Sequence, residues 1–284
     1  MLSPAPHVKW FAAAGGYRYA VRHWPASAKR GHVVLLHGII SHSGWYLRTG
    51  SHLAAAGFHV HALDRRGSGL NLRARGDNDS YLTWLQDVEA YLEHLGGELP
   101  RVLLGVSWGG VLATAVARHA SDQVDGLGLL CPGLFSRKGT GAWQKRLVRL
   151  VRRVGAGSMR VSIPLRDPGL FTETSVHQAY IRDDPFTLRK VTLRCAEASA
   201  DLYSAVIDRP DAWRQPTLLM LAGRDPVIAN DLVRQFVERW TDARASIVEY
   251  PEAGHTLEFE PDPTSYLERL EGWCSEVCAG QSQA

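Results

Sequence analysis

Residues 101–117 read RVLLGVSWGGVLATAVA, and the rest of the chain is interpreted outward from this stretch. An apolar run typical of a buried strand leads into GVSWG, residues 105–109, and small residues typical of a helix follow. In that context G-x-S-x-G indicates a nucleophile elbow, in which Ser107 occupies a strained turn with its hydroxyl clear of the sheet edge. Gly105 and Gly109 are expected where a Cβ would collide with a neighbouring strand or helix. A glycine-rich turn without chemistry remains the alternative.

Two residues later in the chain have the placement that partners of Ser107 require. A serine hydroxyl needs an adjacent general base, and the base needs an acid that orients it. Asp225 follows the predicted strand 217–221, and His255 follows the predicted strand 246–250. The order Ser, Asp, His is the one that this strand–turn–helix architecture uses. We therefore predict Ser107, Asp225 and His255 as catalytic residues, with a plain turn aspartate and a surface histidine as the alternatives.

The segment His37-Gly38-Ile39 follows the first predicted parallel strand and is the candidate for the oxyanion loop. An oxyanion needs two hydrogen-bond donors, and the helix that begins at Trp108 directs one free N–H and the positive end of its dipole toward Ser107. Gly38 lets the backbone approach, so the N–H groups of Ile39 and Trp108 are the predicted donors. His37, Gly38 and Trp108 are predicted to contact the substrate. An ordinary turn after the strand is the alternative.

Strand and helix patterns alternate along most of the chain and predict an α/β fold. A hairpin is expected over 10–25, and short apolar runs alternate with amphipathic helices before residue 133 and again after residue 211. Short continuous apolar strands favour a mostly parallel sheet flanked by helices on both faces. The alternation is lost between 134 and 210, where helical stretches dominate. We predict a core domain of residues 1–133 and 211–284 with a helical cap, or lid, of residues 134–210. The predicted elements, in chain order, are the strand 32–36, the helix 46–56, the strand 58–63, the helix 81–95, the strand 126–131, the strand 215–221, the helix 231–240, the strand 245–250 and the helix 264–277.

These motifs resemble the α/β-hydrolase superfamily, in its monoacylglycerol lipase and lysophospholipase branch, also called serine aminopeptidase-like. The resemblance rests first on the elbow and on two motifs around its predicted partners, GRD at 223–225 and GH at 254–255. It rests also on two earlier stretches. One contains HG at 37–38, SHS at 41–43 and Tyr46, and the other is DRRGSG at 64–69. It implies the α/β-hydrolase fold, a carboxylic-ester hydrolase with a helical cap, and no metal or organic cofactor. It also implies a structural role for the loop 64–80.

Three departures from the pattern of that branch concern the pocket rather than the hydrolytic groups. The branch usually has His where this chain has Val106, and Met where it has Trp108. With Trp108 after the serine, the elbow resembles the Ser-Trp-Gly elbow of proline iminopeptidases. The oxyanion loop reads His-Gly-Ile-Ile rather than a glycine-rich version. We therefore expect a different wall of the acyl pocket, with Trp108 helping to select the acyl group.

Composition excludes several function classes. The chain has 284 residues, of which 45% are hydrophobic and 21% charged, so a large packed core is expected. A net charge of +3 gives no general case for nucleic-acid binding. The four cysteines lack the spacing of a zinc site and suggest no disulfide framework, so reduced thiols and a cytoplasmic location are expected. No signal peptide or membrane span is recognisable, since no run approaches ~18 apolar residues.

Positive charge is concentrated in the predicted cap. Residues 134–210 contain 14 Lys and Arg against 7 Asp and Glu. The predicted helix 143–154 has an apolar face and a basic face, so it can either lie on an anionic membrane surface or pack by its apolar face with a solvated basic face. A basic cap weighs against iminopeptidase activity, because a substrate with a free ammonium group calls for carboxylates.

The sequence therefore predicts a serine ester hydrolase acting through an acyl-enzyme. Monoacylglycerols, lysophospholipids and small acyl esters are the expected substrates, with peripheral contact to an anionic membrane through the basic cap and no obligate protein partner. Two alternatives stay open. One is an amide hydrolase of the proline iminopeptidase type, suggested by Trp108. The other is a non-catalytic hydrolase-fold binding protein, for which a base and an acid beside the serine would have no physical purpose.

Overall fold

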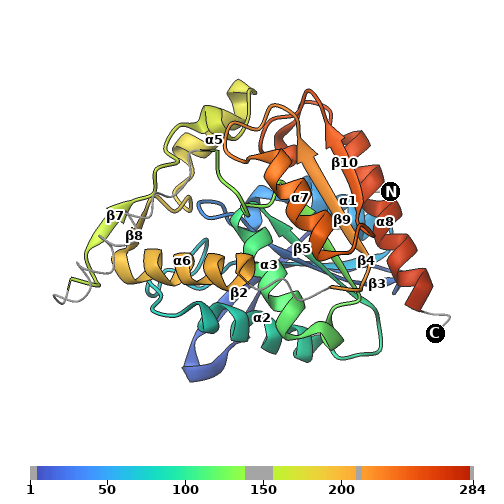
Figure 1. Cartoon of the computed structure of the whole chain (residues 1–284). Helices are drawn as coiled ribbons and strands as arrows, with labels where there is room; N and C mark the ends of the chain where they lie inside the picture. Colours follow the sequence, from blue (N-terminus) through green and yellow to red (C-terminus); the bar gives the residue numbers. More distant parts are fainter. Residues whose placement is uncertain (1–4, 138–155, 209–212, 282–284) are drawn as a thin grey trace.

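The computed structural model describes residues 5–137, 156–208 and 213–281, and in these ranges eight strands form one sheet (Figure 1). Their order across the sheet is β1-β2-β4-β3-β5-β6-β9-β10. Neighbours from β4 to β10 pair in parallel, whereas β2 pairs antiparallel with both β4 and β1. This confirms the predicted α/β fold class. The strands are β1 (His7–Ala12), β2 (Arg18–Trp24), β3 (Gly31–Leu36), β4 (Phe58–Leu63), β5 (Arg101–Val106), β6 (Gly126–Leu130), β9 (Thr217–Ala222) and β10 (Ser246–Tyr250).

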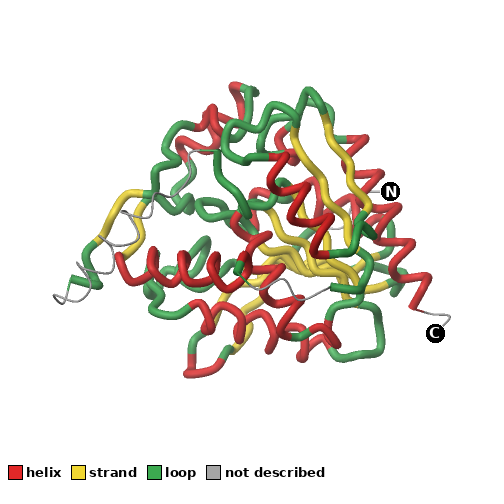
Figure 2. Tube along the Cα trace, in the orientation of Figure 1, coloured by secondary structure: helices red, strands yellow, loops and turns green. Residues whose placement is uncertain are grey.

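Helices cover both faces of this sheet (Figure 2). On one face α2 packs against α3, with α7 further along, and on the other face α1 contacts α8. The predicted bounds of α2 are confirmed because Ser80 accepts the N–H of Leu82 at its start and Gly96, with φ of 72°, follows its last residue. These helices are α1 (Leu47–Ala55), α2 (Tyr81–Leu95), α3 (Trp108–His119), α7 (Asn230–Trp240) and α8 (Thr264–Gln281). Short 3-10 turns are η1 (Ala14–Gly16), η2 (Ser43–Trp45), η3 (Ser121–Gln123), η4 (Pro168–Leu170) and η5 (Leu257–Phe259).

The central strands are buried from end to end, which is why they read as continuous apolar runs rather than alternating ones. Every residue of β6 and β9 is buried, and the same holds for all of β5 but its first residue. Because these strands run parallel, their carboxyl ends share one edge of the sheet. The loops that follow β3, β5, β9 and β10 therefore start at the same edge, where the predicted site residues lie.

The described part of the segment 134–210 is not purely helical, in contrast to the prediction. It contains α5 (Ser175–Asp183) and α6 (Leu193–Ile207), but also β7 (Arg160–Ser162) and β8 (Lys190–Thr192), which pair antiparallel. Strands of three residues are too short to produce a recognisable alternation. Helix α6 contacts both α2 and α3. The predicted helix 143–154 lies outside the described residues. In the ranges that are described, no helix has the length and apolar character needed to cross a membrane.

Candidate active site

The nucleophile elbow has the predicted strand–turn–helix form. β5 ends at Val106, α3 begins at Trp108, and Ser107 between them has φ of 51° and ψ of −122°. A positive φ is costly for a residue with a side chain, so the surrounding packing holds the turn in this geometry. A Cβ on Gly105 would lie 2.6 Å from the Gly109 carbonyl oxygen, and one on Gly109 would lie 2.1 Å from that of Leu36. The two glycines are therefore required by close backbone approach.

The three predicted catalytic side chains meet at the carboxyl edge of the sheet. His255 Nε2 lies 3.0 Å from Ser107 Oγ, and His255 Nδ1 lies 2.7 Å from Asp225 Oδ2. Both His255 and Asp225 are buried, whereas Ser107 is half-buried and can be reached from outside. The second Asp225 oxygen accepts the backbone N–H groups of Val227 and Ile228, at 2.8 and 2.9 Å. These bonds hold the carboxylate in the orientation in which it faces His255.

The hydrogen bonds assign the tautomer of the His255 ring. A carboxylate can only accept, so Nδ1 carries the proton that bonds to Asp225. In the neutral ring Nε2 is then unprotonated and is able to accept the proton of the Ser107 hydroxyl. The edge of the Phe171 ring lies against the imidazole, with centroids 5.8 Å apart, and the Phe171 carbonyl accepts the N–H of Thr256 at 3.0 Å. Phe171 belongs to the segment 134–210, so this segment helps to enclose the histidine.

Two free backbone donors lie beside Ser107. A Cβ placed on Gly38 would be 3.4 Å from the Ser107 Cβ, so the loop after β3 approaches the elbow closely. In the described part of the chain, the backbone N–H groups of Ile39 and Trp108 have no protein acceptor. Both residues are half-buried. Two N–H groups left without a protein acceptor beside a hydroxyl are what an oxyanion hole requires.

His37 lies behind the oxyanion loop with both ring nitrogens occupied. Nδ1 donates to the Gly38 carbonyl at 2.8 Å, and Nε2 accepts the backbone N–H of Arg65 at 3.0 Å. Burial and the nearby Arg65 guanidinium hold the pKa of His37 well below its usual range, so the ring is neutral. The His37 ring therefore joins the oxyanion loop to the backbone of Arg65 and supports the loop. The direct substrate contact expected for His37 stays a prediction.

The Trp108 side chain connects the elbow to the segment 134–210. Its indole Nε1 donates to Ser199 Oγ in α6 at 2.7 Å, and its ring packs edge-to-face on Trp84 of α2, with centroids 5.0 Å apart. Sequence reasoning singled out Trp108 but missed Ser199 and Phe171. No motif marks those two, since each acts through a contact with a residue far away in the chain.

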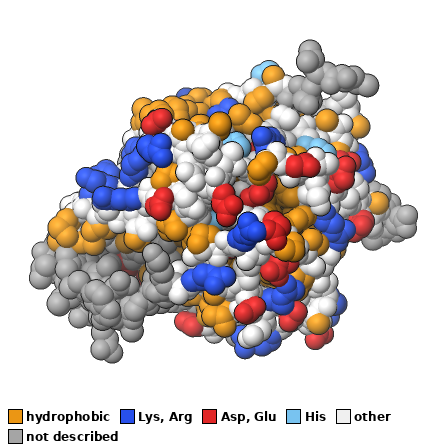
Figure 3. Space-filling view, turned by 90° about the horizontal axis from the view of Figure 1, so that it is seen from above, with side chains coloured by type: hydrophobic (Ala, Val, Ile, Leu, Met, Phe, Trp, Pro, Cys, Tyr) orange, Lys and Arg blue, Asp and Glu red, His pale blue; other side chains and the backbone are white. Residues whose placement is uncertain are grey.

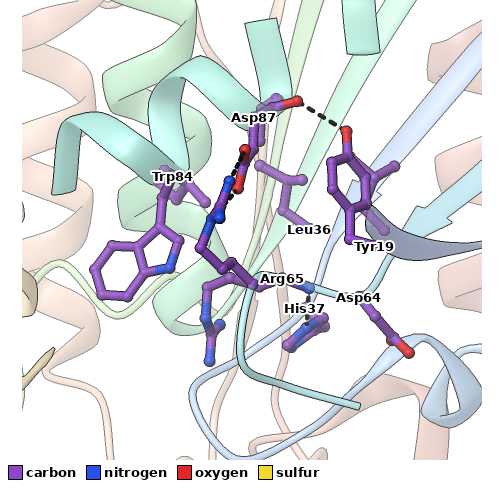
Figure 4. A pocket seen from close by; sticks show the side chains of 11 residues that line it. Tyr19, Leu36, His37, Asp64, Arg65, Trp84 and Asp87 are labelled. Atoms are coloured by element: carbon purple, nitrogen blue, oxygen red, sulfur yellow. Dashed lines mark hydrogen bonds and ion pairs between the residues drawn. The ribbon is translucent and has the colours of Figure 1, made fainter. Parts of the chain in front are cut away.

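A small cavity lies behind the oxyanion loop (Figure 4). Its volume of about 20 Å³ is enough for one water molecule, and Tyr19, His37, Arg65, Trp84 and Asp87 are among its lining residues. The cavity belongs to the support of the site rather than to a substrate pocket. Within the described ranges, no three His, Cys, Asp or Glu side chains are placed to hold a metal ion together.

The amino-acid sequence of this chain is similar to those of known hydrolases. The model of a hydrolase family described as serine aminopeptidase, S33, matches residues 27–262. A monoacylglycerol lipase of Mycolicibacterium smegmatis is 27% identical over 271 residues, which are 93% of this chain and 95% of that protein. The phospholipase YtpA of Bacillus subtilis is 24% identical over 247 residues, 84% of this chain and 93% of that protein.

Solved structures show the same fold. The Paleococcus ferrophilus monoacylglycerol lipase superposes with a TM-score of 0.81 at 24% identity, covering 91% of this chain and 99% of that one. A soluble variant of the Saccharomyces cerevisiae monoglyceride lipase gives a TM-score of 0.85 at 18% identity, with 97% of each chain covered. At these identities the likeness supports the fold, and the chemistry has to be argued from the residues themselves.

Proposed function

Since this chain belongs to the Hydrolase_4 family, serine aminopeptidase S33, we propose that it hydrolyses carboxylic esters with Ser107, His255 and Asp225 as its catalytic residues. The observation that carries the proposal is the bonded chain from Ser107 through His255 to Asp225, with distances of 3.0 and 2.7 Å. A nucleophile, a base and an orienting acid in hydrogen-bond contact are what acyl transfer through a serine requires.

The proposed reaction has two halves. Ser107 Oγ adds to the ester carbonyl carbon while His255 Nε2 takes the hydroxyl proton, and the carbonyl oxygen becomes an oxyanion that accepts the N–H groups of Ile39 and Trp108. The alcohol leaves with the proton from His255, and an acyl-enzyme remains. Water then adds to the acyl carbon with His255 again as the base, and the carboxylic acid is released. Throughout, Asp225 orients the imidazole and stabilises its protonated form.

We propose further that the segment 134–210 is a cap that supplies the substrate pocket. A cavity of about 240 Å³ lies within this segment and is closed by Ile40, the residue that follows the oxyanion loop. Apolar side chains line it together with basic ones, namely Ile40, Ile163 and Leu188 with Arg166, Arg182 and Lys190. Basic side chains gather on the side of the molecule where β7 and β8 lie (Figure 3). An apolar wall with a cationic rim suits an acyl chain linked to an anionic or polar head, as in a lysophospholipid or a monoacylglycerol.

Labelling by a fluorophosphonate probe tests the nucleophile. The wild-type protein should be labelled and should release p-nitrophenol from p-nitrophenyl esters, while Ser107→Ala should do neither. Ser41→Ala is the matched control and should be labelled like the wild type. Ser41 lies just after the oxyanion loop, but its hydroxyl bonds to Tyr46 rather than to His255. A folded, monodisperse wild-type protein that neither reacts with the probe nor turns over any ester would refute the proposal.

The substrate class is tested by rates across a series of substrates. Esters of increasing acyl length, measured with and without vesicles of anionic phospholipid, should show a preference for an apolar acyl chain and a rate increase on the vesicles. The family description as serine aminopeptidase makes amide hydrolysis the second candidate. Faster cleavage of a prolyl anilide than of the p-nitrophenyl esters would favour that candidate instead.

A further inference from the structure

Arg65 places a buried guanidinium directly behind the oxyanion loop. Its Nη1 donates to the Gly38 carbonyl at 3.3 Å, and its Nη2 donates to the Ile39 carbonyl at 3.0 Å and to Ser68 Oγ at 2.9 Å. Figure 4 shows Arg65 between His37 and Trp84, with its backbone bonded to the His37 ring. All of the loop groups that accept from the guanidinium are carbonyl oxygens, so Arg65 holds the loop without occupying its free N–H groups.

The charge of Arg65 has no carboxylate partner in the described part of the chain. The adjacent Asp64 carboxylate accepts the backbone N–H groups of Ser43 and Leu70 instead, at 2.7 and 2.8 Å. Burial lowers the pKa of Arg65 to about 10, which still leaves the guanidinium charged at neutral pH. A buried cation is costly unless its surroundings compensate it. Here the compensation comes from two carbonyl oxygens, the Ser68 hydroxyl, the Trp108 ring and the charge of the nearby Asp64.

The Gly38 carbonyl and the Ile39 N–H are two ends of one peptide group. The described chain contains no cis peptide bond, so in this planar group the C=O and the N–H point in opposite directions. Two donors, the Arg65 guanidinium and His37 Nδ1, hold the C=O end. The N–H end is thereby directed away from them. A cationic donor on the C=O also polarises the peptide and strengthens its N–H as a donor.

Arg65 also contacts the residue that supplies the second oxyanion donor. Its guanidinium carbon lies 4.3 Å from the centroid of the Trp108 ring, within the range of a cation–π interaction. The flat face of the indole stabilises the buried guanidinium electrostatically. Arg65 therefore contacts both parts of the candidate oxyanion hole, the loop after β3 through its carbonyl groups and Trp108 through its ring.

We propose that Arg65 is a positioning residue of the oxyanion hole, orienting and polarising the Gly38–Ile39 peptide while its contact with Trp108 keeps the two donors in register. The inference rests on the proposed ester hydrolysis. It predicts that Arg65 acts on the transition state, in which the oxyanion exists, rather than on the bound ester.

Arg65→Lys and Arg65→Gln test the proposal, because neither can bond both carbonyls and cover the indole. Loss of one oxyanion donor costs about 10²–10³ in kcat, so a weakened donor should lower kcat by about 10- to 100-fold with little change in KM. The inhibition constant of a trifluoromethyl ketone, whose adduct with Ser107 carries an oxyanion, should rise by a similar factor. Affinity for the non-hydrolysable ether analogue of the same ester should stay unchanged.

Arg66→Gln is the matched control. Arg66 is the next residue, but its guanidinium bonds to Asp87 at 2.7 and 2.9 Å and to no carbonyl of the loop. This variant should lower the melting temperature and leave kcat and trifluoromethyl ketone affinity as in the wild type. If Arg65→Gln does not fold, Arg65→Lys carries the same readouts. Folded Arg65 variants with wild-type kcat and wild-type inhibition would overturn the inference.

A readout that needs no turnover separates this inference from the proposed function. In protein labelled with ¹⁵N-isoleucine, the Ile39 amide nitrogen resonance should move upfield in both Arg65 variants, because the guanidinium no longer donates to the Gly38 carbonyl and no longer polarises that peptide group. It should stay in place in Arg66→Gln. An unmoved resonance contradicts the role of Arg65 even where the ester hydrolysis is established. An inactive wild type with a displaced resonance contradicts the ester hydrolysis alone.

Discussion

At the scale of single residues, the site depends on side chains whose orientation is set by backbone groups. Asp225 faces His255 because its other oxygen is held by two N–H groups of the turn that follows it. A carboxylate that accepts three hydrogen bonds in a buried place has no freedom to turn away. Within the proposed mechanism, this makes Asp225 the residue that selects the tautomer of His255.

Asp225→Asn should therefore be nearly inactive while remaining folded. The amide can donate to His255 Nδ1, which moves the ring proton to Nε2 and removes the base from Ser107. We expect kcat for a p-nitrophenyl ester to fall by about 10³–10⁴, with KM little changed.

The matched control for this substitution is Asp231→Asn. Asp231 is an exposed acid at the start of α7. This variant should keep the wild-type kcat. A loss of less than about tenfold in kcat for Asp225→Asn would remove Asp225 from the catalytic role.

At the scale of elements, the candidate active site forms where β5 and the start of α3 pack against the end of β3. Gly109 at the start of α3 lies so close to the Leu36 carbonyl that no side chain fits between them. The same contact brings the elbow next to the loop that begins at His37. Ser107 and the loop after β3 thus owe their proximity to backbone packing between a helix and a strand.

Gly109→Ala should abolish or severely weaken folding. The added Cβ would lie 2.1 Å from a backbone oxygen, which cannot move without shifting β3. Overpacking typically costs about 1–3 kcal/mol in the free energy of unfolding, and contact with a fixed backbone oxygen places this variant at the upper end or above, measurable by urea denaturation.

Gly272→Ala in α8 serves as the comparison for Gly109→Ala. A Cβ at Gly272 would meet no atom within 4 Å, and the position is helical. The free energy of unfolding should rise by about 0.5–1 kcal/mol. Equal stability of the two alanine variants would contradict the close packing at the elbow.

At the scale of the whole molecule, the sheet carries a cluster of histidines that includes none of the predicted catalytic residues. Imidazoles from three neighbouring strands pack together on β2, β4 and β3. His32 Nδ1 lies 3.1 Å from His61 Nε2, the His23 and His61 rings stack 4.5 Å apart, and the Tyr91 hydroxyl lies 3.0 Å from His61 Nδ1. Burial lowers the pKa of His23 and of His32 to about 4, and lowers that of His61 as well.

This cluster should make the fold sensitive to acid. Well above pH 6.5, the ordinary pKa of histidine, the rings are neutral in both the folded and the unfolded chain. As the pH falls from 6.5 toward 4, the unfolded chain binds protons that the folded cluster resists, so the free energy of unfolding decreases. Urea midpoints measured across this interval should fall steadily, and less steeply for His61→Asn.

The control for the acid response is His119→Asn, an exposed histidine outside the cluster. It should keep the slope of the wild type. A wild-type urea midpoint that does not change between pH 6.5 and 4 would contradict the prediction.

Much of the architecture was predictable because local patterns carry it. The predicted bounds 58–63 and 81–95 agree with β4 and α2, since apolar runs and helix caps act within one element. Ser107, Asp225 and His255 could be found because each follows a strand, and parallel strands bring their carboxyl ends to one edge. The pair β7 and β8 was missed because three residues are too few for a period to appear.

The amino-acid sequence by itself determined the elbow, the order of its partners and the fold that joins them. These depend on backbone requirements that particular residue types meet: glycine where backbones touch, a serine at a strained turn, an acid and a histidine after strands. Only the tertiary structure decided what surrounds them. The contacts of Trp108 with Ser199 and with Arg65 join residues far apart in the chain. Such contacts arise from the packing of side chains across elements, and neither periodicity nor spacing encodes them.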